Sequence, residues 1–189
     1  MMTDKKPQLY NDLHPEKSLQ NTGFKDSATA LNTIKIVSKR CLKYQFDVIN
    51  TMYNRAKFHP YKTQQMDEAM VIFHKWLKKY PKIKKHQDEK YKLLTLGQIQ
   101  KYENIYNISE KHKQFLEMYK KVNGKAHKLQ YIPIISNKAN GYDYLSYRIK
   151  FINSRLNKLK NIKLYNLNGS PTKQHVILLL NGYSPDKTV

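Results

Sequence analysis

Acidic side chains are scarce in this sequence. Its 189 residues include 14 Asp and Glu against 35 Lys and Arg, which gives a formal net charge of +21. So many positive charges repel one another in a compact fold, and this repulsion is relieved best when a polyanion is bound. AT-rich coding would explain the choice of Lys over Arg, but it does not explain the shortage of Glu. The composition therefore predicts a nucleic-acid partner, with DNA favoured over RNA.

Long neutral stretches are also lacking, because the positive excess is spread along the whole chain. Residues 1–80 carry 14 basic and 7 acidic side chains, residues 81–128 carry 12 and 5, and residues 129–189 carry 9 and 2. Each segment therefore has a net charge of +7. The lysines alternate with Tyr, Leu, Ile and Phe, whereas a disordered basic arm would be poor in apolar residues. This predicts a folded body that is basic throughout.

Cysteine and long apolar runs are nearly absent. Cys41 is the only cysteine, so the chain can form neither an internal disulfide nor a zinc site built on cysteines. The longest apolar runs, Ala69–Phe73 and Val176–Leu180, are too short to cross a bilayer, and residues 1–12 have no apolar signal segment. We expect an intracellular protein that is neither secreted nor inserted in a membrane.

Motifs for catalysis are missing as well. The six glycines form no GxGxxG or GxxxxGK[ST] loop, and the seven histidines show no HExxH spacing. The acidic pairs Asp67/Glu68 and Asp88/Glu89 are adjacent in sequence, so their carboxylates would not converge on a cation from one helix. A tyrosine nucleophile would need more arginines around a phosphate than the chain provides. We predict a protein that is not an enzyme and has no cofactor or metal.

What the sequence does contain is helical periodicity, which predicts a mostly α-helical fold with two helical units. Residues 1–22 form a mobile lead-in without periodicity, and residues 23–81 form a three-helix unit. Its helices are expected after an N-cap at Asp26 or Ser27, over Tyr44–Lys57, and from Thr63 or Gln64 to Tyr80, where Pro81 would end the third helix.

Residues 82–92 are predicted to be a basic linker or the start of a helix, and residues 93–189 to be the second helical unit. Ser109 is a candidate N-cap, with Gly124 after the end of that helix. Asp143 would begin a helix whose apolar side, or seam, runs from Leu145 to Leu159. Ser170 as the cap, Pro171 at the first helical position and Gly182 past the end frame a helix that contains Val176–Leu180, although a buried strand would have the same apolar residues.

Three groups of basic residues are candidates for binding phosphate. The first is a ridge beside the apolar seam of the helix after Asp143, where arginine forks and an aromatic ring could contact phosphate and base. A solvated amphipathic helix would have the same pattern. The ridge consists of Arg148, Phe151, Arg155 and Lys158, extended outward by Tyr147 and Lys150.

The other two groups are rich in lysine, which binds phosphate as a point charge and carries little base information. One of them crosses the predicted end of the third helix, where the helix dipole alone would stabilise part of it. It contains Lys78, Lys79, Lys82, Lys84 and Lys85. The last group surrounds the first two helices and contains Lys39, Arg40, Lys43, Arg55 and Lys57.

One part of the chain resembles known sequences. The segment TGFKDSATALNTIKIVSKR and, after a short gap, YQFDVINTMYNRAKFHPYKTQQMDEAMVIFHKWLKKY lie within residues 22–80. This stretch is similar to a segment of uncharacterised proteins from large nucleocytoplasmic DNA viruses. The matching elements are ALNTI, YQ, INTMYNRAK with His59, and the Met, Ala, Phe and Trp-Leu spacing of the third helix. The resemblance implies a viral origin and a place in the virion or in the viral factory of the host cytoplasm.

The sequence as a whole predicts a sequence-tolerant nucleic-acid-binding protein, architectural or packaging in role, that acts by neutralising phosphates. Two alternatives remain open at this point. One is a scaffold protein of virion assembly that binds acidic proteins, and the other is an accessory enzyme of nucleic-acid processing. The oligomeric state is left open.

Overall fold

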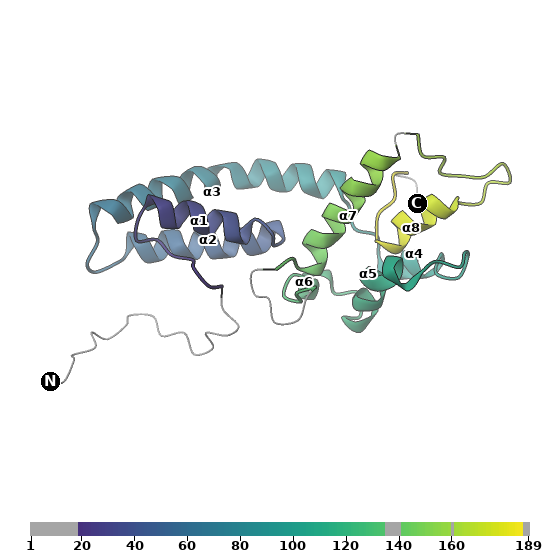
Figure 1. Ribbon diagram of the computed structural model, residues 1–189, viewed down its shortest axis with the longest axis horizontal. Coiled ribbons are helices and arrows are strands. Elements are labelled where there is room, and N and C mark those ends of the chain that lie inside the picture. The colour runs from purple at the N-terminus through teal and green to yellow at the C-terminus, as the bar shows by residue number, and fades with distance from the viewer. Residues whose placement is uncertain (1–18, 135–140, 160, 187–189) are drawn as a thin grey trace.

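The computed structural model describes residues 19–134, 141–159 and 161–186, and these residues form eight helices and no strand. The predicted mostly α-helical fold is confirmed. Figure 1 shows α1, α2 and α3 side by side at the N-terminal end and the other helices grouped at the opposite end. None of the helices in these ranges is both long enough and apolar enough to cross a membrane.

The N-terminal unit is a bundle of α1 (Ser27–Val37), α2 (Leu42–Lys57) and α3 (Gln64–Lys90). The Asp26 carboxylate accepts a hydrogen bond from the Thr29 amide at 2.7 Å and so caps α1, as the sequence predicts. The three helices bury a common apolar cluster. This cluster consists of Ala30, Val37, Ile49, Ala69 and Phe73.

Much of the predicted lead-in, residues 1–18, lies outside the described residues. Its last part is held against the bundle, because Leu19 packs on the apolar cluster and the Asn32 side chain donates to the Asn21 carbonyl at 3.0 Å. The Gly23 amide also donates to the Thr33 hydroxyl at 2.9 Å. The bundle therefore begins before Gly23.

The predicted end of α3 at Pro81 is wrong, because the helix continues for nine more residues, to Lys90. Proline removes one backbone hydrogen bond, the one to the carbonyl of Leu77. Pro81 is exposed, so this carbonyl lies toward solvent, where water can satisfy it. Residues 82–90 are thus neither a linker nor a new helix. They extend α3 to the second unit (Figure 1).

The second unit contains the other five helices of the described residues. They are α4 (Leu96–Gln100), α5 (Glu110–Lys121), α6 (Ala126–Leu129), α7 (Tyr144–Lys158) and α8 (Lys173–Leu180). Every residue from His175 to Leu180 is buried, so α8 is the central helix of this unit and packs on α4 and α5. The apolar run at the end of the chain is therefore helical, as favoured above.

The beginning of α8 differs from the prediction by two residues. Its N-cap is Thr172, whose hydroxyl accepts from the His175 amide at 3.4 Å, whereas Pro171 lies before the helix and pairs with Tyr165 in an isolated bridge. Ser170 instead bonds within the preceding turn. Gly182 follows the helix with a φ of 69°, as predicted, and a Cβ there would lie 2.5 Å from Leu93.

Candidate nucleic-acid interface

Arg148, the first residue of the predicted ridge, lies inside the protein. Its side chain is 3 % exposed. Its Nε donates to the Asn181 carbonyl at 2.7 Å, and its Nη2 donates to the Gly182 carbonyl at 2.8 Å. The other two acceptors are the carbonyls of Tyr91 at 3.1 Å and Lys92 at 3.3 Å. The predicted phosphate contact at Arg148 is therefore wrong.

These four carbonyls explain why a cation is buried here. Tyr91 and Asn181 are the C-cap residues of α3 and α8, so Arg148 lies against the negative ends of two helix dipoles at once. Burial lowers the pKa of the Arg148 guanidinium to about 10, which still leaves it charged at neutral pH. Arg148 thus joins α3 to α8 through α7.

The rest of the ridge does not form a continuous surface either. Phe151 packs against the core of the second unit, with its ring centroid 5.7 Å from that of His112. Arg155 is half-buried and donates to the Gln174 side chain at 2.6 Å. Lys158 alone among the four ridge residues is fully solvent-exposed.

The two outward extensions of the ridge are also separated from it. Tyr147 is half-buried, and the Lys150 ammonium lies over the ring of Tyr142, 4.6 Å from its centroid. The amphipathic-helix interpretation of this pattern therefore describes α7 better than the phosphate ridge does.

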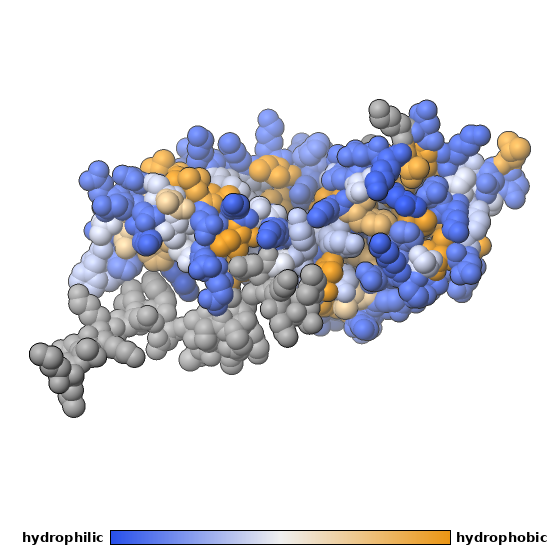
Figure 2. Space-filling view, viewed as in Figure 1, coloured by the Kyte–Doolittle hydropathy of each residue, from blue (hydrophilic) through white to orange (hydrophobic). Residues whose placement is uncertain are grey.

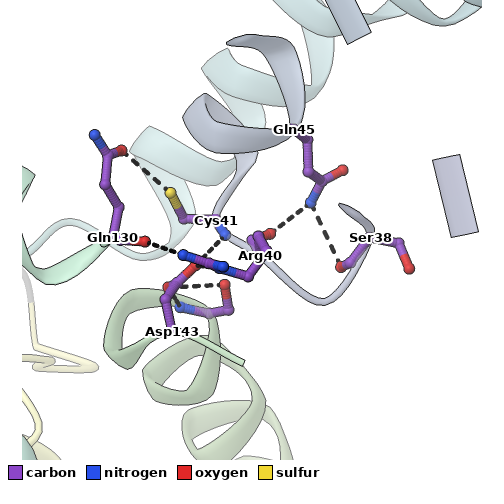
Figure 3. Close-up of polar contacts among 7 residues, drawn as sticks. Ser38, Arg40, Cys41, Gln45, Gln130 and Asp143 are labelled. Atoms are coloured by element: carbon purple, nitrogen blue, oxygen red, sulfur yellow. Dashed lines mark hydrogen bonds and ion pairs between the residues drawn. The ribbon is translucent and has the colours of Figure 1, made fainter. Parts of the chain in front are cut away.

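Arg40, from the third basic group, is the other buried arginine, and it connects the two units (Figure 3). Its Nε contacts the Asp143 carboxylate at 3.2 Å, and its Nη2 donates to the Gln130 carbonyl at 2.7 Å. Arg40 is 6 % exposed and Asp143 is fully buried. Its guanidinium also lies over the Tyr44 ring, 4.1 Å from the centroid. Arg40 is thus not available to a phosphate.

We call the contact of Arg40 with Asp143 and Gln130 the joint between the two units, and Asp143 lies at its centre. Its carboxylate accepts from the amide of Ser146 at 2.7 Å, which caps α7, and from the amide of Cys41 at 2.6 Å. The Cys41 thiol donates to the Gln130 side-chain oxygen at 3.3 Å. Burial, followed by the nearby Asp143 charge, raises the pKa of Cys41 to about 11. The thiol is therefore protonated at neutral pH and has a packing role.

The remaining members of the third group lie far from one another. Lys39 is exposed beside the joint, and Lys43 forms an ion pair with Asp47 on the next turn of α2. Arg55 and Lys57 lie at the other end of α2, about 20 Å away at 1.5 Å per residue. The third group therefore does not form one surface.

Four lysines of the second basic group form, together with Lys75, a continuous surface along the side of α3 that faces away from α1 and α2. At about 100° per residue, its members share an arc of about 120°, opposite the buried Phe73. We call this surface the outer lysine face. It consists of Lys75, Lys78, Lys79, Lys82 and Lys85.

Lys84 belongs to the same predicted group but lies on the opposite side of the helix. It faces the second unit and lines a cleft with Tyr80 and Gln87. Lys75, in contrast, was missed by the sequence analysis. Lys75 precedes Lys78 by three residues and Lys82 by seven, and this helical spacing indicates that it shares their side of the helix.

Acids also lie along this side of α3, with Glu89 four residues after Lys85, but none forms an ion pair with the outer lysine face within the described residues. None of its five lysines forms an ion pair there, and all are exposed. The nearest acids on the preceding turns are already engaged, since Asp67 pairs with Lys62 at 2.5 Å and Glu68 accepts from the Ser27 hydroxyl at 3.0 Å. Figure 2 shows hydrophilic side chains along the α3 edge of the molecule, interrupted by small apolar patches.

The ranges that the structure describes hold no candidate metal site. They contain no cluster of three His, Cys, Asp or Glu side chains that could hold a metal ion. Comparison of the chain with models of protein families, with curated proteins and with solved structures finds no match. The geometry of the chain itself is therefore the basis for a functional proposal.

Proposed function

We propose that this protein binds nucleic acid without sequence specificity and that the outer lysine face of α3 is its main contact with phosphates. The observation that carries the proposal is the row of five exposed, unpaired lysines on one side of a single helix. A surface of this kind concentrates positive potential and attracts a polyanion. The formal net charge of +21 supports the same partner.

The dimensions of the face suit a phosphate backbone. From Lys75 to Lys85 the helix rises about 15 Å, which corresponds to about four nucleotides of one strand at 3.4 Å each. Lysine ammonium groups hold phosphates as point charges and do not distinguish bases. Binding by this face would therefore depend strongly on salt and weakly on sequence, as expected for an architectural or packaging protein.

The viral setting rests on the resemblance of residues 22–80, and this segment contains α1, α2 and most of the outer lysine face. A packaging protein in a virion would need sequence-tolerant binding along a long polyanion. The proposal therefore assigns phosphate binding to the bundle and places the protein in the virion or the viral factory.

One observation favours the alternative of a scaffold that binds other proteins. Leu167 is fully exposed, at 110 %, at the tip of a turn that the Asn166 amide closes by donating to the Ser170 carbonyl at 2.8 Å. The scaffold alternative requires a partner that buries this side chain on binding, because a single exposed Leu is otherwise common on protein surfaces. In that case, Leu167→Asp would abolish binding to the partner and leave DNA binding unchanged.

Salt titration with labelled DNA tests the main proposal. The affinity of the full chain for two unrelated 20-base-pair duplexes is measured by fluorescence anisotropy between 50 and 300 mM KCl. Neutralisation of about five phosphates predicts a slope of about −4.5 for log affinity against log salt, and the two duplexes should bind within about threefold of each other. If the protein binds neither duplex nor single-stranded DNA at 50 mM KCl, the proposal is wrong.

A further inference from the structure

A cleft with a volume of about 450 Å³ lies between the bundle and the second unit. This volume is within the usual range of about 300–1,000 Å³ for sites that hold a small molecule, and such sites are common where two units meet. The walls are apolar for the most part. They include Leu42, Leu93, Ala126, Leu145 and Ile149.

An amide with unused donors lines this cleft. Gln130 is 7 % exposed, and its side-chain oxygen accepts from the Cys41 thiol. Its amide nitrogen forms no hydrogen bond within the described residues, and Figure 3 shows it pointing away from the Arg40 and Asp143 network. This nitrogen is therefore free to donate to an acceptor that a ligand brings into the cleft.

The remaining lining residues add positive charge and an aromatic ring. Lys84 and Lys92 contribute exposed ammonium groups that form no ion pair with any described residue, whereas Asp88 is the single carboxylate among the lining residues. The Tyr80 ring is held in place by Phe46, with centroids 4.4 Å apart, and by Trp76, at 6.0 Å. The cleft thus combines a fixed ring, apolar walls, an amide donor and cations.

We propose that this cleft takes one nucleotide unit of a single-stranded nucleic acid, with its base inside and its phosphates at Lys84 and Lys92. The proposal rests on the proposed function and specifies which form of nucleic acid the protein prefers. A base has flat apolar faces and acceptor atoms on its edge, which match the walls and the Gln130 amide. In a duplex the base is stacked and paired, so a duplex can occupy the outer lysine face but not the cleft.

The first test compares labelled dT15 with an abasic strand of the same length, which keeps the phosphates and lacks the bases. Stacking and hydrogen bonding of one base predict that dT15 binds about tenfold more tightly at 150 mM KCl. Ile149→Trp fills the cleft and should abolish this difference. Gln130→Met, which keeps the length of the side chain and removes its donors, should reduce it.

Two adjacent lysines of α3 give a matched control that needs no change in the core. Both Lys84 and Lys85 are exposed, but Lys84 lines the cleft and Lys85 belongs to the outer lysine face. Lys84→Ala should weaken binding of dT15 more than binding of a duplex. Lys85→Ala should weaken both to the same extent. This pair of variants tests whether the cleft binds single strands even if Ile149→Trp impairs folding.

The outcomes separate this inference from the proposed function. If dT15 and the abasic strand bind with equal, salt-dependent affinity, the proposal that the cleft binds a base is wrong, and the proposal for the outer lysine face still holds. Binding of neither strand nor of duplex overturns both proposals. If thymidine monophosphate alone binds as tightly as dT15, the cleft is a site for free nucleotides and the inference of strand binding is wrong.

Discussion

The bundle and the second unit are both basic, but they use their cations in different ways. In the bundle, the lysines of α3 are exposed and form no ion pairs within the described residues. In the second unit, Arg148 is buried and satisfies four carbonyls, and at the junction Arg40 binds Asp143. Net charge alone therefore does not tell which cations are free to meet a partner.

The difference follows from the chemistry of the two side chains. The guanidinium group has five donors in a fixed plane and can satisfy several buried carbonyls at once, whereas an ammonium group is compact and strongly hydrated. Arginine therefore suits an internal joint between helix ends, and lysine suits a solvated surface. Two of the four arginines of this chain, Arg40 and Arg148, are buried.

Replacing Arg148 should have the largest effect on the stability of the protein. Arg148→Met leaves four carbonyls at the ends of α3 and α8 without their donor, so we expect a loss of about 4 kcal/mol in the free energy of unfolding, measured in urea. Lys150→Met, on an exposed position of the same helix, should cost less than about 0.5 kcal/mol. If Arg148→Met instead weakens DNA binding at unchanged stability, the contrast between the two units fails.

Removing the carboxylate at the junction should come next. Asp143→Ala takes away the cap of α7 and leaves the buried Arg40 without its ion-pair partner, and we expect a loss of about 3 kcal/mol. A double-mutant cycle with Arg40→Met measures how far the two residues depend on each other. Because they contact directly, the double variant should be less destabilised than the sum of the two single variants. Additive losses would show that Arg40 does not act through Asp143.

A change of pH should have a smaller effect on stability, through His175. His175 is 1 % exposed and bridges the Leu164 carbonyl and the Ser184 hydroxyl, each at 3.1 Å. Burial lowers the pKa of His175, so the unfolded chain takes up this proton at higher pH than the folded chain does. The contribution of His175 is therefore complete above the unfolded value of about 6.5 and is lost as pH falls below it.

Hydrogen exchange can locate this loss. Amides of α8 and of residues 183–186 should exchange faster at pH 5 than at pH 7, after correction for the intrinsic rates, and His175→Gln should reduce that change. Burial also lowers the pKa of His112, so part of the pH dependence should remain in the variant. Equal loss of protection in α1 and α2 would show that the effect is not specific to the second unit.

The sequence predicts the helices where local signals agree. Asp26 and Asp143 were identified as caps, and the periodicity of α2 and α7 gave their extents to within two residues. The errors occur where solvent or neighbouring helices override a local rule. Pro81 is tolerated because its missing hydrogen bond lies toward water, and Thr172 rather than Ser170 caps α8 because Pro171 pairs with Tyr165.

The candidate site was predicted less well, because burial of a charged residue depends on contacts distant in sequence. The acceptors of Arg148 lie 33, 34, 56 and 57 residues away, and Arg40 and Asp143 are 103 residues apart. No local pattern on α7 indicates these partners. The lysines of α3, in contrast, could be found from spacing alone, since one exposed side of one helix contains them.

The most direct test of this account compares two sets of three lysine substitutions. One set changes Lys78, Lys82 and Lys85 of the outer lysine face to Gln, and the other changes Lys101, Lys121 and Lys125, which are exposed on the second unit, to Gln. Both variants lose the same net charge. We predict that the first set reduces the magnitude of the salt slope for duplex binding by about 2.7, with little change from the second set. Equal reductions in both would contradict a defined phosphate-binding face on α3.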